Sequence, residues 1–169
     1  LLFALVFTSI VMAQVTTVPG IIQKGYDGEV TIIFNPNEGN KGMVGATQCY
    51  AHTGLITTAS SSDSDWKNVV EEWRKNTAKT QLTKDGDNWK LVIPNIYTFY
   101  NCSKSTEIKK LAFVFHDGPS GTKEGKTAEG TDIFVELQEA GLAVSIASAI
   151  PEISKQGDKV TLQCYATES

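Results

Sequence analysis

The chain has 169 residues, with 15 lysines and arginines against 19 aspartates and glutamates and a formal net charge of −4 at pH 7. Apolar residues make up 41% and charged residues 20% of the sequence, which is typical of a globular domain and excludes intrinsic disorder. The mildly acidic balance, with no run of lysine and arginine interleaved with aromatic residues, argues against a nucleic-acid partner.

The chain begins with an apolar, uncharged run, LLFALVFTSIVMA. Crossing a bilayer takes about 20 such residues, so this shorter run predicts a secretory signal peptide over residues 1–13, truncated at its start. Val11 and Ala13 are the small residues that a signal peptidase reads, and a cut after Ala13 leaves Gln14 as the mature N-terminus. We therefore expect a secreted protein with no membrane span after signal removal. A buried strand is the alternative.

The next segments alternate between apolar and polar residues, as strands do. Residues 29–35 (EVTIIFN) are the first expected strand. Residues 47–52 (TQCYAH) are the second, and alternation places Cys49 on one face with Tyr50 and His52 on the other.

A serine-rich loop precedes a segment that two structures fit equally well. Its apolar residues stand at i, i+3, i+4 and i+7, which is a helical spacing; they are Trp66, Val69, Val70 and Trp73. A short helix and an extended segment held by tertiary contacts are both open. We expect Trp73 to lie in the core.

Asp-Gly within residues 79–93 predicts a β-hairpin with Trp89 in the core. The aromatic run IYTFY, ending at Tyr100, is expected to cap the core as an edge strand or a loop. Residues 111–115 (LAFVF) and 132–137 (DIFVEL) are further strands, and their phenylalanines Phe113, Phe115 and Phe134 are expected in the core. Because no helices alternate with the strands, the sequence predicts an all-β, antiparallel immunoglobulin-like β-sandwich over residues 14–142.

The last residues, 143–169, predict a further pair of strands. Val144 and Ile146 alternate with polar residues before Pro151, and Leu162 and Cys164 do so after it. Two strands are too few to bury a core of their own. We expect the beginning of a second, incomplete immunoglobulin-like domain, and the alternative is that these strands complete the first domain.

The cysteines are odd in number: Cys49, Cys102 and Cys164. Export permits disulfides, but three thiols cannot all pair within one chain. Cys49–Cys102 is the pair to test, and the alternative is that Cys49 and Cys164 are buried apolar side chains. The histidines, His52 and His116, show no metal-binding spacing, so we expect no metal site and no cofactor.

Three segments carry a family resemblance when taken in order. They are YAHTG at residues 50–54, Asp65-Trp66 with Trp73, and LAFVFHDG at 111–118, which leads through a glycine-rich loop to TDIFV at 131–135. Together they resemble the N-terminal immunoglobulin-like module of secreted bacterial α-amylase-family glycoside hydrolases from polysaccharide-utilisation systems. The strand pattern is also similar to small starch-binding modules, although the loop lacks their Trp-Asp-Asn. The resemblance implies a β-sandwich ahead of a second small module and a catalytic barrel.

Tyr50, His52 and Trp66 are the candidate carbohydrate-binding residues. The apolar side of a sugar ring packs on flat aromatic faces, and polar groups around its edge bind the hydroxyls. Tyr50 and His52 share a strand face, Trp66 would complete a platform, and Asp65 or Lys67 would reach the hydroxyls. The alternative is that these aromatic side chains are buried in the sandwich.

No catalytic residues are expected. A glycosidase needs two carboxylates across a cleft, and no spacing selects a pair among Asp63, Asp65, Glu71, Glu72, Asp117 and Asp132. The resemblance therefore implies a noncatalytic accessory module of a starch- or α-glucan-degrading enzyme, with α-glucan and the downstream catalytic domain of the same chain as partners. The alternatives are a purely structural immunoglobulin-like spacer and a protein-interaction domain that uses its strand edges.

Overall fold

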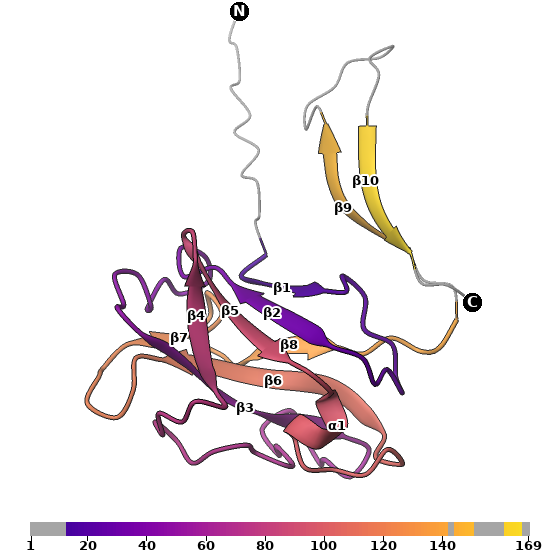
Figure 1. Cartoon of the computed structure of the whole chain (residues 1–169), viewed down its shortest axis with the longest axis horizontal. Coiled ribbons are helices and arrows are strands. Elements are labelled where there is room, and N and C mark those ends of the chain that lie inside the picture. Colours follow the sequence, from indigo (N-terminus) through magenta and orange to yellow (C-terminus); the bar gives the residue numbers. More distant parts are fainter. Residues whose placement is uncertain (1–12, 142–143, 151–160, 167–169) are drawn as a thin grey trace, which may run out of the picture.

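A computed structural model of the chain describes residues 13–141, 144–150 and 161–166. In these ranges the regular secondary structure is almost entirely β-strand, and the one helix is a single turn (Figure 1). The elements are β1 (Val15–Val18), β2 (Val30–Phe34), β3 (Cys49–Thr57), β4 (Gln81–Asp85), β5 (Asn88–Ile93), α1 (Ile96–Phe99), β6 (Ile108–His116), β7 (Glu124–Gly125), β8 (Ile133–Glu136), β9 (Val144–Ile150) and β10 (Thr161–Ala166).

The first eight strands form two layers that face each other. One layer has the order β1-β2-β5-β4, and the other consists of β3, β6 and a split last strand, β7 and β8, along the same edge of β6. This is the strand order of a constant-type immunoglobulin domain. Strand β4 pairs with β5 and also, through Gln81 and Leu82, with β3, so the two layers nearly close into a barrel. The predicted all-β antiparallel fold is confirmed.

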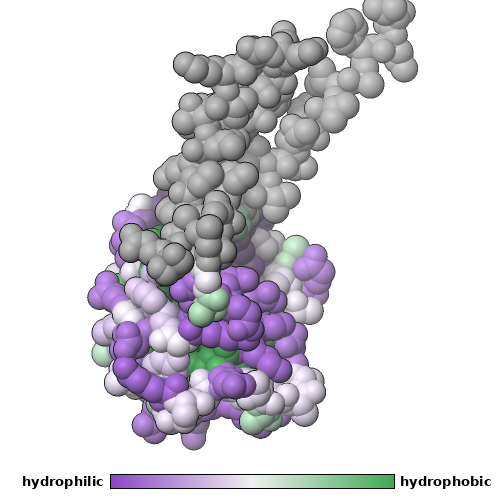
Figure 2. Space-filling view, turned by 90° about the vertical axis from the view of Figure 1, so that its right-hand side faces the viewer, coloured by the Kyte–Doolittle hydropathy of each residue, from purple (hydrophilic) through white to green (hydrophobic). Residues whose placement is uncertain are grey.

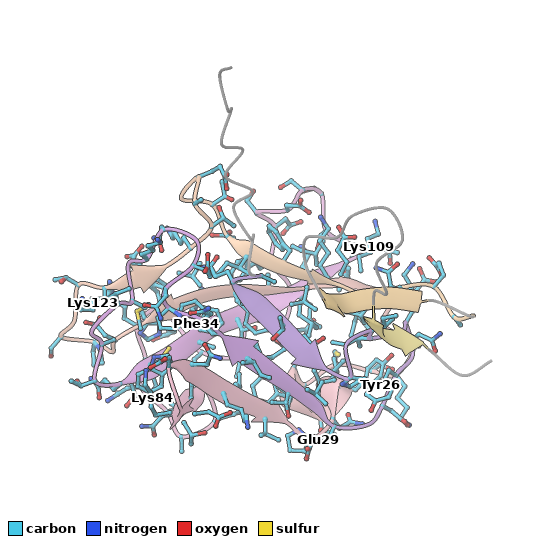
Figure 3. The ribbon with its side chains drawn as sticks, turned by 90° about the horizontal axis from the view of Figure 1, so that it is seen from above. Tyr26, Glu29, Phe34, Lys84, Lys109 and Lys123 are labelled. Atoms are coloured by element: carbon cyan, nitrogen blue, oxygen red, sulfur yellow. The ribbon has the colours of Figure 1, made fainter. Side chains whose placement is uncertain are left out.

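The core lies between the layers because each strand turns alternate apolar residues inward. Val30, Ile32 and Phe34 of β2 are buried, and the residues between them are half-buried. The Phe34 ring stacks on Phe115 of the opposite layer, with ring centroids 4.0 Å apart. Figure 3 shows Phe34 within the sandwich. On the side seen in Figure 2, hydrophilic residues cover most of the surface that the grey atoms leave visible.

The hairpin and the second buried strand agree with the sequence patterns. Strands β4 and β5 flank Gly86, whose φ of 59° suits the tight turn. Trp89 of β5 is buried, as are Phe113 and Phe115 of β6. These core predictions are confirmed.

One end of the core is capped by the α1 turn, where a loop or edge strand was expected. Asn95 is the N-cap, and its Oδ1 accepts a hydrogen bond from the Thr98 amide at 3.0 Å. Tyr97, Phe99 and Tyr100 are buried against the core, so the predicted capping role is confirmed.

Two core predictions are wrong. Trp73 is 44% exposed, because the chain around it lies across the outer face of β3 and β6 instead of entering the core. Phe134 is half-buried on the same outer face, where the Lys110 Nζ lies 5.1 Å from its ring centroid. Residues 66–73 form no helix; Lys67 alone forms a β-bridge with β3, and the rest of the segment is an irregular loop with a left-handed residue at Asn68.

The cysteine pair proposed from the sequence does not form. Cys49 and Cys102 are both free thiols. Cys49 is fully buried on the inner face of β3, and burial raises the pKa of its thiol. It therefore behaves as a small apolar side chain.

Strands β9 and β10 pair with each other in an antiparallel sheet of their own. The predicted strand pair at the C-terminal end is thus confirmed, and its assignment to a second domain stays a prediction. The predicted signal peptide lies, up to residue 12, outside the described residues. In the part of the chain that the structure describes, no helix is long and apolar enough to span a membrane.

Candidate functional site

The outer face of the β3–β6–β8 layer gathers residues from distant parts of the sequence in two rows. In the first row, Tyr50 of β3 pairs with His116 of β6, which pairs with Glu124 of β7. In the second row, His52 pairs with Val114. The β6–β8 register places Ile133 opposite Phe113, so Asp132, one residue earlier, continues the second row.

Five rings pack together on this face, and we call them the aromatic cluster: Tyr50, His52, Trp66, Trp73 and His116. The His52 ring stacks on Trp66 with centroids 5.4 Å apart, and it meets Trp73 nearly edge-on at 5.1 Å. Trp73 also contacts His116 at 5.4 Å, and Tyr50 stacks on His116 at 5.8 Å. Trp73 therefore joins the two rows.

Backbone pairing brings Trp66 onto this face. The Leu55 amide donates to the Lys67 carbonyl at 2.8 Å, and the Lys67 amide donates back to Leu55 at 2.7 Å. Gly54 pairs with Ala112, next to the row of His52, and provides the space that Trp66 needs. A Cβ at residue 54 would lie 3.3 Å from the Trp66 Cε3 and 3.1 Å from the Lys67 carbonyl oxygen. The absence of a side chain at Gly54 thus allows the indole to lie on the sheet.

Arg74 fixes the position of Trp73. Its guanidinium carbon lies 5.3 Å from the Trp73 ring centroid, within the range of a cation–π contact. Its Nη1 donates to the Gly121 carbonyl at 2.7 Å, and Nη2 donates to Glu124 at 3.2 Å. Asp117 completes an ion pair at 3.4 Å. Arg74 therefore ties the loop that carries Trp73 to the loop between β6 and β7.

Burial keeps both histidines of the cluster neutral. The pKa of His116 is lowered to about 4, mainly by burial and also by the nearby Arg74 guanidinium and His52, although Asp117 and Glu124 act in the opposite direction. The Gly118 amide donates to His116 Nδ1 at 3.1 Å, so the neutral ring carries its proton on Nε2. Burial also lowers the pKa of His52, while the Glu71 backbone and the Asp132 carboxylate raise it.

The predicted site residues are only partly available to a ligand. His52 and Trp66 are half-buried and stacked on each other, as their candidate role requires. Tyr50 is only 5% exposed, so its ring presents little surface to a ligand, and it stacks on His116 from one side.

Asp65 and Lys67, the expected hydroxyl-binding pair, are bonded to each other. The Lys67 Nζ lies 2.7 Å from the Asp65 Oδ1, and this hydrogen bond, together with those from Ser61, lowers the pKa of Asp65 to about 2. The Asp65 Oδ2 also accepts hydrogen bonds from Ser61. Both side chains are therefore already engaged.

Sequence reasoning missed Trp73, His116 and Arg74. The contact of His116 with Tyr50 depends on the β3–β6 register, which no local pattern reveals. Trp73 and Arg74 stand in a segment with a helical spacing that the fold does not use. The signals in the sequence were the place of Trp73 in the family resemblance and its adjacency to an arginine in a polar stretch.

The rest of the described surface offers weaker candidates. A shallow, open cleft of about 700 Å³ beside β4 is lined by Ala46, Leu82, Lys84 and Trp89, among others, and shares no residue with the aromatic cluster. Among the described residues, no three His, Cys, Asp or Glu side chains converge as a metal site requires.

Comparison with known proteins assigns no family to the chain. Its sequence matches no protein-family model, and no curated protein matches it.

Proposed function

We propose that this chain is a noncatalytic accessory module of a secreted starch- or α-glucan-degrading enzyme and that it binds α-glucan on the aromatic cluster. One observation carries the proposal: Trp73 is 44% exposed although it packs against both His52 and His116. An exposed indole held in a fixed position by its neighbours is what a sugar ring requires of a stacking platform.

The polar atoms of the two tryptophans differ in a way that suits this role. The Trp66 Nε1 donates to the Asp63 carbonyl at 3.0 Å, so Trp66 is held in place by the protein itself. The Trp73 Nε1 makes no hydrogen bond with any residue that the structure describes. It can therefore donate to a hydroxyl of the ligand.

The inclination of the rings favours a curved polysaccharide. The Trp66 plane lies at 24° to His52, whereas the Trp73 plane lies at 85° to it. The two indoles are thus steeply inclined to each other. Successive rings of an α-1,4-linked glucan turn along a curved chain, whereas a flat β-1,4-linked chain needs coplanar platforms. The resemblance of the sequence to modules of α-amylase-family enzymes supports the same ligand and a downstream catalytic domain as the covalent partner.

A structural spacer is the second candidate function, and one observation favours it. Tyr50 and His116 are buried, with 5% and 1% of their surfaces exposed, so two of the five rings of the cluster serve only to cover the sheet. A spacer needs no exposed tryptophan, however, and it predicts that the loss of the Trp73 ring changes nothing but packing.

Affinity electrophoresis in gels containing amylopectin separates the two functions. The proposal predicts that amylopectin retards the wild-type chain and that Trp73→Ala abolishes the retardation. Val92→Ala is the matched control, because Val92 is also 44% exposed but lies on β5 of the other layer. Equal mobility of the wild-type chain with and without amylopectin would reject α-glucan binding and favour the spacer.

A further inference from the structure

Asp132 lies at the rim of the aromatic cluster. It continues the row that His52 and Val114 form across β3 and β6. Val114 faces outward, yet only 4% of its surface is exposed, so side chains of this face cover it. Asp132, the next residue of the row, is half-buried. The side chain therefore stands where the covered part of the face ends.

Asp132 differs from the other acidic side chains of this face because its carboxylate is unpaired. Asp63 accepts from Lys110 at 3.0 Å, and Glu71 accepts from Thr77 at 2.9 Å. Glu124 binds Arg74, as described above. The Asp132 carboxylate makes neither a hydrogen bond nor an ion pair with any part of the chain that the structure describes.

The electrostatics of His52 agree with this placement. The Asp132 carboxylate is among the groups that raise the pKa of His52, so its charge acts on the ring that contacts both Trp66 and Trp73. Strands in a sheet lie about 4.8 Å apart, so His52 and Asp132, separated by one strand, flank a strip roughly 10 Å wide.

We propose that Asp132 is the specificity-determining acceptor of this face and binds two adjacent hydroxyls of the sugar ring that stacks on Trp73. This inference rests on the proposed carbohydrate-binding function. An ionised carboxylate has two acceptor oxygens and no donor, and two neighbouring equatorial hydroxyls present two O–H donors at matching spacing. Hydrogen bonds to a charged acceptor are shorter and stronger than neutral ones. The ligand class is therefore a pyranose with free, adjacent equatorial hydroxyls, such as those at positions 2 and 3 of glucose.

The test uses β-cyclodextrin and its derivative methylated at every 2-hydroxyl, which keeps the rings intact and removes one donor of each pair. Calorimetry on the full chain would compare the wild type, Asp132→Asn and the control Asp87→Asn, which makes the same charge change at an exposed turn of the other layer. We expect Asp132→Asn to bind β-cyclodextrin roughly tenfold more weakly than the wild type, and Asp87→Asn to bind normally. Methylation should weaken binding to the wild type and leave binding to Asp132→Asn unchanged.

Each result distinguishes this inference from the proposed function. If the wild type and Asp132→Asn bind both sugars equally well, the cluster binds carbohydrate but Asp132 does not bind its hydroxyls. This result overturns the inference and leaves the proposed function standing. If the wild type binds neither β-cyclodextrin nor amylopectin, the proposed function and the inference both fall. An NMR titration adds a readout without ligand: Asp132→Asn should lower the pKa of His52, and an unchanged value would show that Asp132 does not act at the cluster.

Discussion

The rings of His52 and Trp66 lie parallel to within 24°, with their centroids 5.4 Å apart, although one residue belongs to β3 and the other to the loop that follows it. The contact forms because the chain returns along β3 and pairs Lys67 with Leu55. Stacked aromatic pairs contribute about 0.5–1.5 kcal/mol beyond the area that they bury. Because His52 also contacts Trp73, the stacked pair lies directly beside the exposed Trp73 ring.

Replacing Gly54 tests whether Trp66 depends on the space above this residue. A Cβ there would lie 3.1 Å from the Val69 Cγ2 and 3.3 Å from Trp66. We expect Gly54→Val to lower the free energy of unfolding by about 1–3 kcal/mol through overpacking, and Gly54→Ala to have a stability between those of the wild type and Gly54→Val. Without this overpacking, valine would be expected to stabilise a strand relative to glycine. A urea titration in which Gly54→Val is as stable as the wild type, or more stable, would contradict the packing described here.

Arg74 is expected to contribute more stability than an ordinary surface charge. Its side chain is only 18% exposed and bonds to Gly121, Glu124 and Asp117. Lysine cannot reproduce this planar set of donors, so Arg74→Lys should lower the free energy of unfolding by roughly 1–2 kcal/mol. The control is Lys75→Met, which removes an exposed ion pair with Glu72 and should change stability by less than about 0.5 kcal/mol. Equal effects of the two substitutions in urea unfolding would refute the role of Arg74.

Stability should fall as the pH drops below the usual pKa of histidine. His116 has its pKa lowered from 6.5 to about 4, so the unfolded chain binds a proton there at pH values where the folded chain does not. The unfolding free energy therefore decreases from about pH 6.5 to about pH 4, by on the order of 3 kcal/mol for this group, and levels off below. His52, whose pKa is also lowered, adds a smaller decrease in the same direction.

His116→Asn isolates this effect because asparagine keeps an acceptor for the Gly118 amide but does not titrate. The variant will be less stable at neutral pH, and the informative quantity is the slope of its unfolding free energy between pH 6.5 and 4, measured by urea titration. We expect a shallower slope than in the wild type. Parallel slopes would show that His116 is not held neutral in the folded protein.

The buried hydroxyl pair of Tyr100 and Thr53 should couple α1 to β3. The Thr53 hydroxyl donates to the Ala112 carbonyl at 2.8 Å, so the Tyr100 hydroxyl, 2.7 Å away, is the donor between the two. Tyr100→Phe is expected to cost about 1 kcal/mol, and Thr53→Val about 1–3 kcal/mol because it leaves the tyrosine hydroxyl unpaired. A double-mutant cycle should give a coupling energy of at least about 0.5 kcal/mol. Strictly additive effects would argue against the hydrogen bond.

Local patterns were enough to predict the strands but not the surface that they present. Alternation and the Asp-Gly turn predict β2, β4, β5 and β8 because these signals depend only on neighbouring residues. The same alternation places Ile133 and Leu137 inward, which puts Phe134 on the outer face, so its assignment to the core contradicted the period of its own strand.

The candidate site depends on pairings that the sequence does not show. Tyr50 and His52 share the outer face, as alternation predicts, but which of them is exposed depends on His116, 64 to 66 positions later in the chain, and on the loop that carries Trp73. Residues 66–73 have a helical spacing, yet pairing with β3 holds the start of this segment extended. Tertiary hydrogen bonds here override local propensity.

The most direct test of α-glucan binding at the aromatic cluster is an NMR titration of the indole N–H signals with maltoheptaose. The chain has three tryptophans, and two of them, Trp66 and Trp73, belong to the cluster, whereas Trp89 is buried in the core. Single Trp→Phe variants assign the signals. We expect maltoheptaose to shift the Trp73 signal most and the Trp66 signal less, and to leave the Trp89 signal in place. Three unmoved signals at saturating sugar would contradict this expectation.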